Sequence, residues 1–113
     1  MKTLLAALVL TAVLAFAPGA LAAGSISTAT TTITSGGTLT VNVCVGTAGD
    51  GGYLLVKGPN TFQQDLFFGP IPGCSDVFVT TVGWAAGKYR INGYEATPKR
   101  NVGLGSVTLT VTA

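Results

Sequence analysis

The amino-acid sequence predicts an all-β protein, a sandwich of two antiparallel sheets, on three observations. Residues 38–45 alternate without a fault between apolar and polar side chains, which is typical of a strand with one buried face. Seven such short segments follow one another along the chain, separated by turns rich in glycine and proline. No helical periodicity appears after residue 23. Short strands at regular spacing with turns of this kind favour a two-sheet sandwich.

The start of the chain differs from the rest and predicts a secretory signal peptide. Lys2 precedes an apolar run that continues to Phe16, and a small-residue run at residues 20–23 follows the break at Pro18. A basic start, a short apolar core and an A-x-A end are the signature of such a peptide, whereas a membrane anchor needs a longer unbroken run. We therefore expect a signal peptide at residues 1–22 and one mature domain at residues 23–113. The protein would then be secreted, to the periplasm, the cell surface or the exterior.

The strands are expected, in chain order, at residues 24–34, 37–46, 53–57, 61–68, 74–82, 88–96 and 105–112. The first is rich in threonine and alternates poorly, as expected of an edge strand. The connection at residues 47–52 is predicted to be flexible, and the connection at residues 69–73 to be rigid because it contains two prolines. The expected core consists of inward-facing residues: Leu39, Val41, Val43, Tyr89, Ile91, Val107, Leu109 and Val111.

The chain resembles bacterial immunoglobulin-like domains over nearly all of its mature part. Residues 35–41, Ser-Gly-Gly-Thr-Leu-Thr-Val, resemble the second strand of those domains. Residues 86–91, Ala-Gly-Lys-Tyr-Arg-Ile, resemble their sixth strand, which carries a tyrosine at a corner. The resemblance implies an immunoglobulin-like sandwich of about seven antiparallel strands, with the hydroxyl of Tyr89 bonded to nearby backbone. It departs from antibody domains, because the sixth strand has no cysteine and the third has no tryptophan.

The only two cysteines, Cys44 and Cys74, predict one disulfide in an exported chain. In the architecture that the resemblance implies, their strands, the second and the fifth, are antiparallel neighbours. Setting Cys44 opposite Cys74 then places Val41 opposite Val77 and Leu39 opposite Val79. The apolar residues of both strands share one face in this register, and the sulfurs lie on the outer face.

The sequence offers no catalytic or metal-binding motif. It contains no histidine, which removes the commonest general base and the usual metal ligand. Asp76 and Glu95 could in principle meet as a pair for glycoside hydrolysis, but a domain of this size has little room for a cleft. Residues 46–52 resemble a phosphate loop only superficially, because they lack its Lys-Ser/Thr and precede a strand. We expect no enzyme activity, no cofactor and no metal.

Basic and aromatic side chains share an outward parity on two of the predicted strands. In an immunoglobulin-like sandwich the third and sixth strands are neighbours, so these side chains would form a single face. The alternative is an ordinary solvated sheet face with cross-strand pairs. The candidate binding face comprises Tyr53, Lys57, Lys88, Arg90 and Tyr94, together with Lys99 and Arg100 in the loop that follows.

The charge of the mature chain is too small to argue for a nucleic-acid partner. The whole chain has six basic and four acidic side chains, and without Lys2 the difference is 5 − 4 = +1. We expect a secreted non-enzymatic module that binds a protein or a surface polymer, or assembles with itself, with no membrane span after removal of the signal. A second hypothesis is a subunit of an extracellular filament built by strand exchange, which the low charge and the threonine-rich strands favour. A third is a small secreted protein inhibitor.

Overall fold

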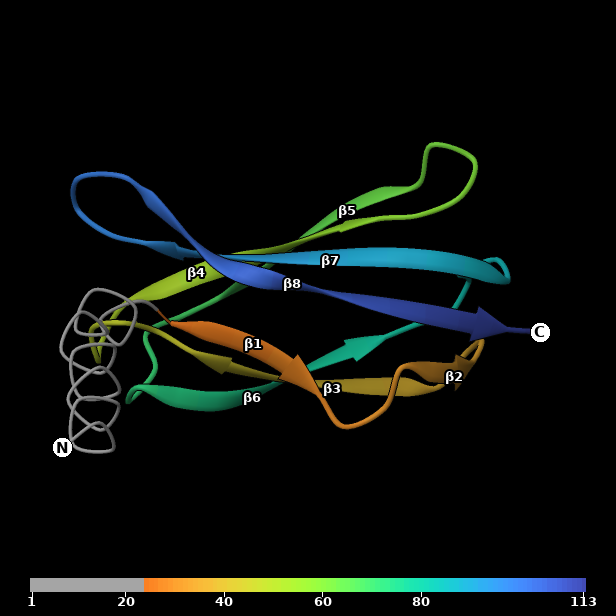
Figure 1. Cartoon of the computed structure of the whole chain (residues 1–113), viewed down its shortest axis with the longest axis horizontal. Helices are drawn as coiled ribbons and strands as arrows, with labels where there is room; N and C mark the ends of the chain where they lie inside the picture. Colours follow the sequence, from red (N-terminus) through yellow and green to blue (C-terminus); the bar gives the residue numbers. More distant parts are fainter. Residues whose placement is uncertain (1–23) are drawn as a thin grey trace, which may run out of the picture.

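The structure is a computed structural model that describes residues 24–113, which form eight strands in two facing sheets (Figure 1). In chain order these are β1 (Ser25–Thr28), β2 (Thr32–Thr34), β3 (Thr38–Cys44), β4 (Gly51–Lys57), β5 (Gln63–Phe68), β6 (Cys74–Thr80), β7 (Gly87–Ala96) and β8 (Asn101–Thr112). One sheet has the order β1-β3-β6 and the other the order β2-β8-β7-β4-β5. The predicted all-β sandwich is confirmed, with no helix in residues 24–113. None of these residues forms a helix that is long and apolar enough to cross a membrane. The predicted signal peptide, residues 1–22, lies outside the described part of the chain.

The single edge strand predicted at residues 24–34 is two strands in the structure. The segment at residues 24–34, expected as one edge strand, divides into β1, antiparallel to β3, and β2, parallel to β8. Its two isoleucines explain the division. Ile26 and Ile33 are an odd number of residues apart, so they would face opposite sides of one continuous strand. The break between β1 and β2 lets Ile26 enter the core and Ile33 pack against it.

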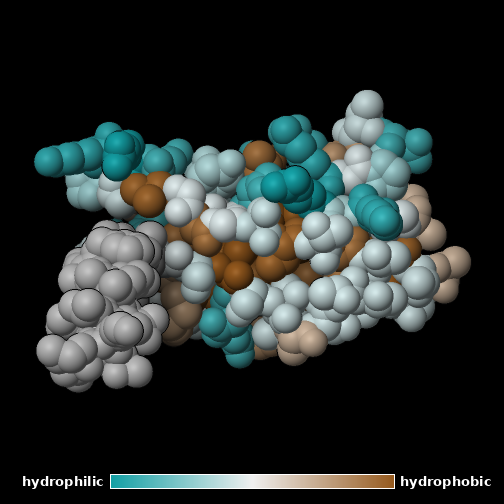
Figure 2. All heavy atoms as spheres, in the orientation of Figure 1, coloured by the Kyte–Doolittle hydropathy of each residue, from teal (hydrophilic) through white to brown (hydrophobic). Residues whose placement is uncertain are grey.

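The core lies between the two sheets, and Figure 2 shows it as a hydrophobic band that runs lengthwise between the hydrophilic residues of the two layers. Seven of the eight residues expected in the core are buried. Val107 is only half-buried, because β2 covers β8 only from Thr110 onward and leaves the edge at Val107 open. Leu54 and Val56 of β4 are fully buried, and the sequence analysis did not name them.

Tyr89 anchors an aromatic cluster at one end of the core. Its hydroxyl donates a hydrogen bond of 2.6 Å to the carbonyl of Ala85, which confirms the predicted bond to nearby backbone. Its ring stacks on Trp84 at a centroid distance of 4.8 Å and meets Phe62 edge-on at 5.4 Å. Trp84, which the sequence placed only in a corner between strands, is therefore a core residue, and the corner itself helps to close the sandwich.

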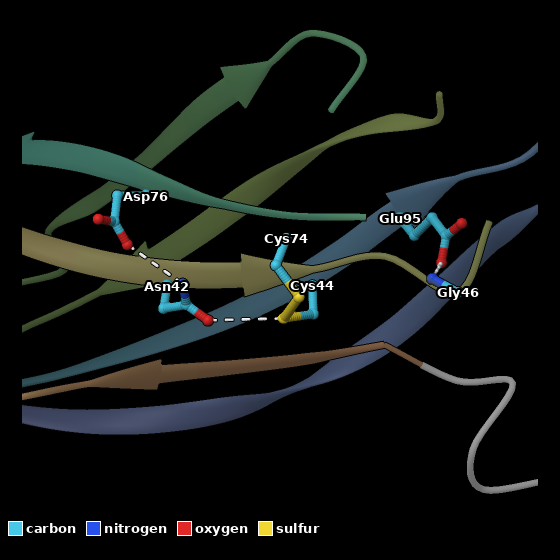
Figure 3. Close-up of a disulfide and its surroundings, with 6 residues drawn as sticks. All are labelled: Asn42, Cys44, Gly46, Cys74, Asp76 and Glu95. Carbon is cyan, nitrogen blue, oxygen red and sulfur yellow. Dashed lines mark hydrogen bonds between the residues drawn. A yellow bond between two sulfur atoms is a disulfide. The ribbon is translucent and has the colours of Figure 1, made fainter. Parts of the chain in front are cut away.

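The register of β3 and β6 is the predicted one, with Cys44 opposite Cys74, Val41 opposite Val77 and Leu39 opposite Val79. The two cysteines form a disulfide with their Cα atoms 4.0 Å apart, on the outer face of the three-stranded sheet (Figure 3). Beside it, Asn42 donates a side-chain hydrogen bond of 3.1 Å to Asp76. The contact of 3.5 Å between Cys44 Sγ and Asn42 Oδ1 is van der Waals only, because a disulfide sulfur has no proton to donate.

Removing the disulfide should destabilise the fold without changing it. The bridge closes a loop between residues 30 positions apart, so the Cys44→Ala/Cys74→Ala variant should lose about 3–4 kcal/mol of unfolding free energy in the chain-entropy model. The fluorescence of Trp84, the single tryptophan, reports the urea transition. Wild-type protein with a reductant serves as the control and should unfold at the same urea concentration as the variant. A loss below about 1 kcal/mol would contradict the entropic account.

Candidate functional site

The strands β4 and β7 bring part of the predicted binding face together on the outer side of the five-stranded sheet. Tyr53 lies opposite Tyr94, and Lys57 lies opposite Arg90. The alternate residues of both strands are fully buried, for example Val56 and its partner Ile91. Because successive side chains of a strand point to opposite faces, Tyr53, Lys57, Arg90 and Tyr94 all point away from the core.

Three aromatic rings from three strands form a row across this face, which we call the aromatic row: Phe67, Tyr53 and Tyr94. The rings of Tyr53 and Tyr94 stack at 5.0 Å with an interplanar angle of 22°, and Phe67 lies 5.8 Å from Tyr53. Phe67 is 78% exposed, although burial of its ring would stabilise the fold. The sequence analysis missed Phe67. Phe67 alternates in phase with Gln63 and Asp65 along β5, and this spacing indicates an outward side chain. The neighbouring apolar residues Leu66 and Phe68 obscured that pattern.

A hollow of about 260 Å³ continues the aromatic row beyond Tyr94. Its lining comprises Asn92, Gly93, Tyr94, Gly103, Gly105 and Ser106. In this row Tyr94 lies opposite Gly103 of β8, and a Cβ at Gly103 would have no atom of residues 24–113 within 4 Å. A β-bulge interrupts the regular pairing of β7 and β8 at Gly93/Tyr94, and Gly105, the partner of Gly93, has a φ of 114°. One face of the Tyr94 ring is therefore covered by Tyr53, and the other faces the hollow.

Lys57 and Arg90, which we call the basic pair, face each other directly. Their row across the sheet reads Gln63, Lys57, Arg90 and Thr108, so no carboxylate is opposite either cation in the described strands. Like charges in directly opposed positions destabilise a sheet. The guanidinium of Arg90 donates a hydrogen bond of 3.3 Å to Ser106 Oγ, and Ser106 lines the hollow. This bond holds a positive charge at the rim of the hollow.

The other predicted cations lie outside this cluster. Lys88 is exposed on β7 opposite Thr110, beyond the basic pair. Lys99 and Arg100 lie in the β7–β8 turn, which a backbone hydrogen bond of 3.0 Å from Thr97 to Arg100 closes. The structure thus brings together Tyr53, Tyr94, Lys57 and Arg90, and places Lys99 and Arg100 at the tip of a hairpin.

A second polar cluster surrounds Glu95, which is only 3% exposed and points into the sandwich. Its carboxylate accepts a hydrogen bond of 2.8 Å from the amide of Gly46 (Figure 3) and one of 3.3 Å from the amide of Thr47. A further backbone bond of 2.7 Å joins Gly49 to Ile71. The connection between β3 and β4 was predicted to be flexible. In the structure, hydrogen bonds hold it both to Glu95 of β7 and to Ile71 in the β5–β6 connection. It is also shorter than predicted, because β4 already begins at Gly51.

The carboxyl that lies near Glu95 is that of Asp50, and Asp76 is on the outer face of the other sheet. Burial raises the pKa of Glu95, but hydrogen bonds from Gly46, Asp50 and Thr47 together bring it below its usual value of 4.5. The pKa of Asp50 lies above its usual 3.8, first because its protonated carboxyl donates a hydrogen bond to Glu95, and then through burial and the charge of Glu95. In residues 24–113 no three His, Cys, Asp or Glu side chains come together to hold a metal ion.

Two variants that each remove one negative charge from this cluster should have opposite effects on stability. Glu95→Gln weakens the bonds to Gly46 and Thr47. It should therefore lower the free energy of unfolding by about 1 kcal/mol at pH values above the usual pKa of Glu95. This cost disappears as the pH falls through the lowered pKa of Glu95 in the folded protein. Asp50→Asn removes the repulsion from Glu95, so it should raise the melting temperature above the raised pKa of Asp50, and the gain shrinks as the pH falls through that pKa. Thermal unfolding between pH 3 and pH 8 measures both effects, and shifts in the same direction would contradict the coupling.

Comparisons with known proteins give no relative for this chain. No protein-family model matches it, and neither the curated proteins nor the solved structures contain a match.

Proposed function

We propose that the chain is an exported, non-enzymatic module of immunoglobulin-like type that binds a partner through the outer face of its five-stranded sheet. The observation that carries the proposal is the aromatic row beside the basic pair. Tyrosine and arginine supply large contact areas and are enriched at binding hot spots. Export is supported by the leader-like sequence at residues 1–22 and by the disulfide.

The order of the strands supports the immunoglobulin-like assignment. Antibody-type constant domains hold their first, second, fourth and fifth strands in one sheet, and their third, sixth and seventh strands in the other. With β2 and β5 set aside as additions to the larger sheet, β1, β3 and β6 correspond to the first, second and fifth strands, and β4, β7 and β8 to the third, sixth and seventh. The fourth strand has no counterpart in the smaller sheet of residues 24–113. The bond from Tyr89 to Ala85 occupies the position of a tyrosine corner, ahead of the sixth such strand.

Two features of the outer face lower the stability of the fold, and no structural role explains them. Phe67 leaves most of its ring in water, and Lys57 opposes Arg90 without a carboxylate in their row. Local departures of this kind are expected at functional sites, where a bound partner compensates for them. An ordinary solvated face would place a polar residue at Phe67 and opposite charges at the pair.

The Arg90→Ala/Tyr94→Ala variant should lose binding to surface material from the producing cells while melting near the wild-type temperature. Both side chains lie on the outer face, so their removal leaves the core intact. The matched control is Thr40→Ala/Phe78→Ala, an opposed pair on the outer face of the other sheet, which should bind like wild type. Fluorescently labelled protein and sedimentation with cell envelopes measure the binding. Equal retention of both double variants would exclude the outer face as the binding surface.

A filament subunit built by strand exchange is the second candidate, and β1 is the observation that favours it. This strand has only four residues, lies at a sheet edge, and inserts Ile26 against Gly93, where a Cβ would be 2.6 Å from Ile26 Cγ2. A short edge strand that fills a pocket with one apolar side chain can be replaced by the same strand of another copy.

Deletion of residues 24–33 should therefore stop assembly if the protein forms filaments, and the Arg90→Ala/Tyr94→Ala variant should still assemble. Light scattering and electron microscopy of the purified protein at rising concentration give the readout. Because the deletion can unfold the domain, a synthetic peptide of residues 24–34 is added to it as a complementing strand. A monomeric wild-type protein at every concentration would dismiss this candidate.

A further inference from the structure

We infer that the hollow beside Tyr94 is a subsite for one ring of an acidic polysaccharide, a polymer of sugar units that carry carboxylate groups. The inference rests on the proposed function, since it names the partner of that same outer face. It follows from three properties of the hollow: an uncovered aromatic face, a polar lining, and a cation at the rim.

The aromatic face selects a flat group of about one ring. Among residues 24–113, Tyr94 is stacked by Tyr53 on one side only, and Gly103, whose missing side chain leaves the hollow open, stands opposite its other side. A volume of about 260 Å³ lies just below the range of roughly 300–1,000 Å³ typical of sites for drug-sized ligands. A ring that enters the hollow would continue the stack of Phe67, Tyr53 and Tyr94. The C–H face of a sugar ring is apolar and can pack on an aromatic ring in this way.

The remaining lining favours a sugar over an apolar side chain of a peptide. Within the described part of the chain, no aliphatic side chain lines the hollow, and the groups beside Tyr94 are the Asn92 amide, the Ser106 hydroxyl and glycine backbone. An amide and a hydroxyl both donate and accept hydrogen bonds, which suits the hydroxyls on the edge of a sugar ring. Burial of an apolar peptide side chain would instead call for an aliphatic pocket.

The rim supplies the preference for an acidic unit. Arg90 reaches the rim through its bond to Ser106 Oγ, and Lys57 faces Arg90 from β4. A guanidinium binds a carboxylate with two parallel hydrogen bonds, and a bound carboxylate would also relieve the repulsion between Arg90 and Lys57. The basic pair lies four residues along β7 from Tyr94, which is about 13 Å in a strand. A polymer that lies along β7 would therefore touch the aromatic row and the basic pair with neighbouring units.

The test uses polygalacturonate as the probe, with two matched polymers and two matched variants. Fully methyl-esterified polygalacturonate keeps the rings and loses the charge, and polyglutamate keeps the charge and loses the rings. Gly103→Leu fills the hollow, and its φ lies outside the left-handed region, so the fold should accept it. Gly69→Leu is the control and lies in the β5–β6 connection. A Cβ at Gly69 would likewise have no atom of residues 24–113 within 4 Å, and its φ is not left-handed.

Affinity electrophoresis and amide chemical shifts of Gly103 and Gly105 give the readout. Wild type and Gly69→Leu should bind polygalacturonate alike, while Gly103→Leu should bind about ten-fold more weakly, the loss of one good stacking or charge-assisted contact. The methyl ester and polyglutamate should each bind wild type more weakly than polygalacturonate does. Equal binding of polyglutamate, insensitive to Gly103→Leu, would replace the sugar with an acidic peptide and overturn the inference.

The failure of this inference is distinguishable from the failure of the proposed function. If no acidic polysaccharide binds, but the Arg90→Ala/Tyr94→Ala variant still loses cell-surface material that wild type retains, the sugar subsite is wrong and the binding face stands. If that variant also retains the material, both are wrong.

Discussion

The two-residue alternation of β7 sets both the inside and the outside of this protein. Tyr89, Ile91 and Glu95 point into the sandwich, and the intervening Arg90 and Tyr94 form the outer face. A slip of one residue in the pairing with β4 would bury a guanidinium and expose Ile91, which is a cost that no surface contact offsets. The hydrophobic core therefore also fixes which side chains stand together outside.

The buried Glu95 extends this dependence to the loops. Its carboxylate sits at the end of β7 and bonds to the amides of Gly46 and Thr47, in the connection that follows β3. The disulfide ties β3 to β6 close to the start of the same connection. One covalent bond, the disulfide, and the hydrogen bonds of one carboxylate, that of Glu95, thus hold this end of the sandwich. The aromatic packing of Tyr89, Trp84 and Phe62 closes another part of the core.

The sequence predicted those parts of the fold that depend on the alternation of apolar and polar residues along a single strand. The faces of β3 and β7 follow from a period of two, because that period is a property of a single strand. The register of Cys44 against Cys74 needed, in addition, the strand neighbours that the family resemblance implies. The odd spacing of Ile26 and Ile33 indicates a break between β1 and β2, but a local pattern does not contain the sheet that each half joins. The same limit explains why Phe67 was missed, since its place beside Tyr53 is created by the pairing of β4 with β5. The hollow was invisible for a different reason: it is defined by a side chain that Gly103 lacks.

Gly103 gives the protein a route for evolutionary change that is separate from folding. A Cβ at this position has no atom of the described residues within 4 Å, and the backbone does not need glycine there, so residues of increasing size can enter without repacking the core. Each would alter the depth of the space beside Tyr94, while the strands that carry it stay as they are. A single codon change at Gly103 would thus reshape this face and leave the stability of the domain almost untouched.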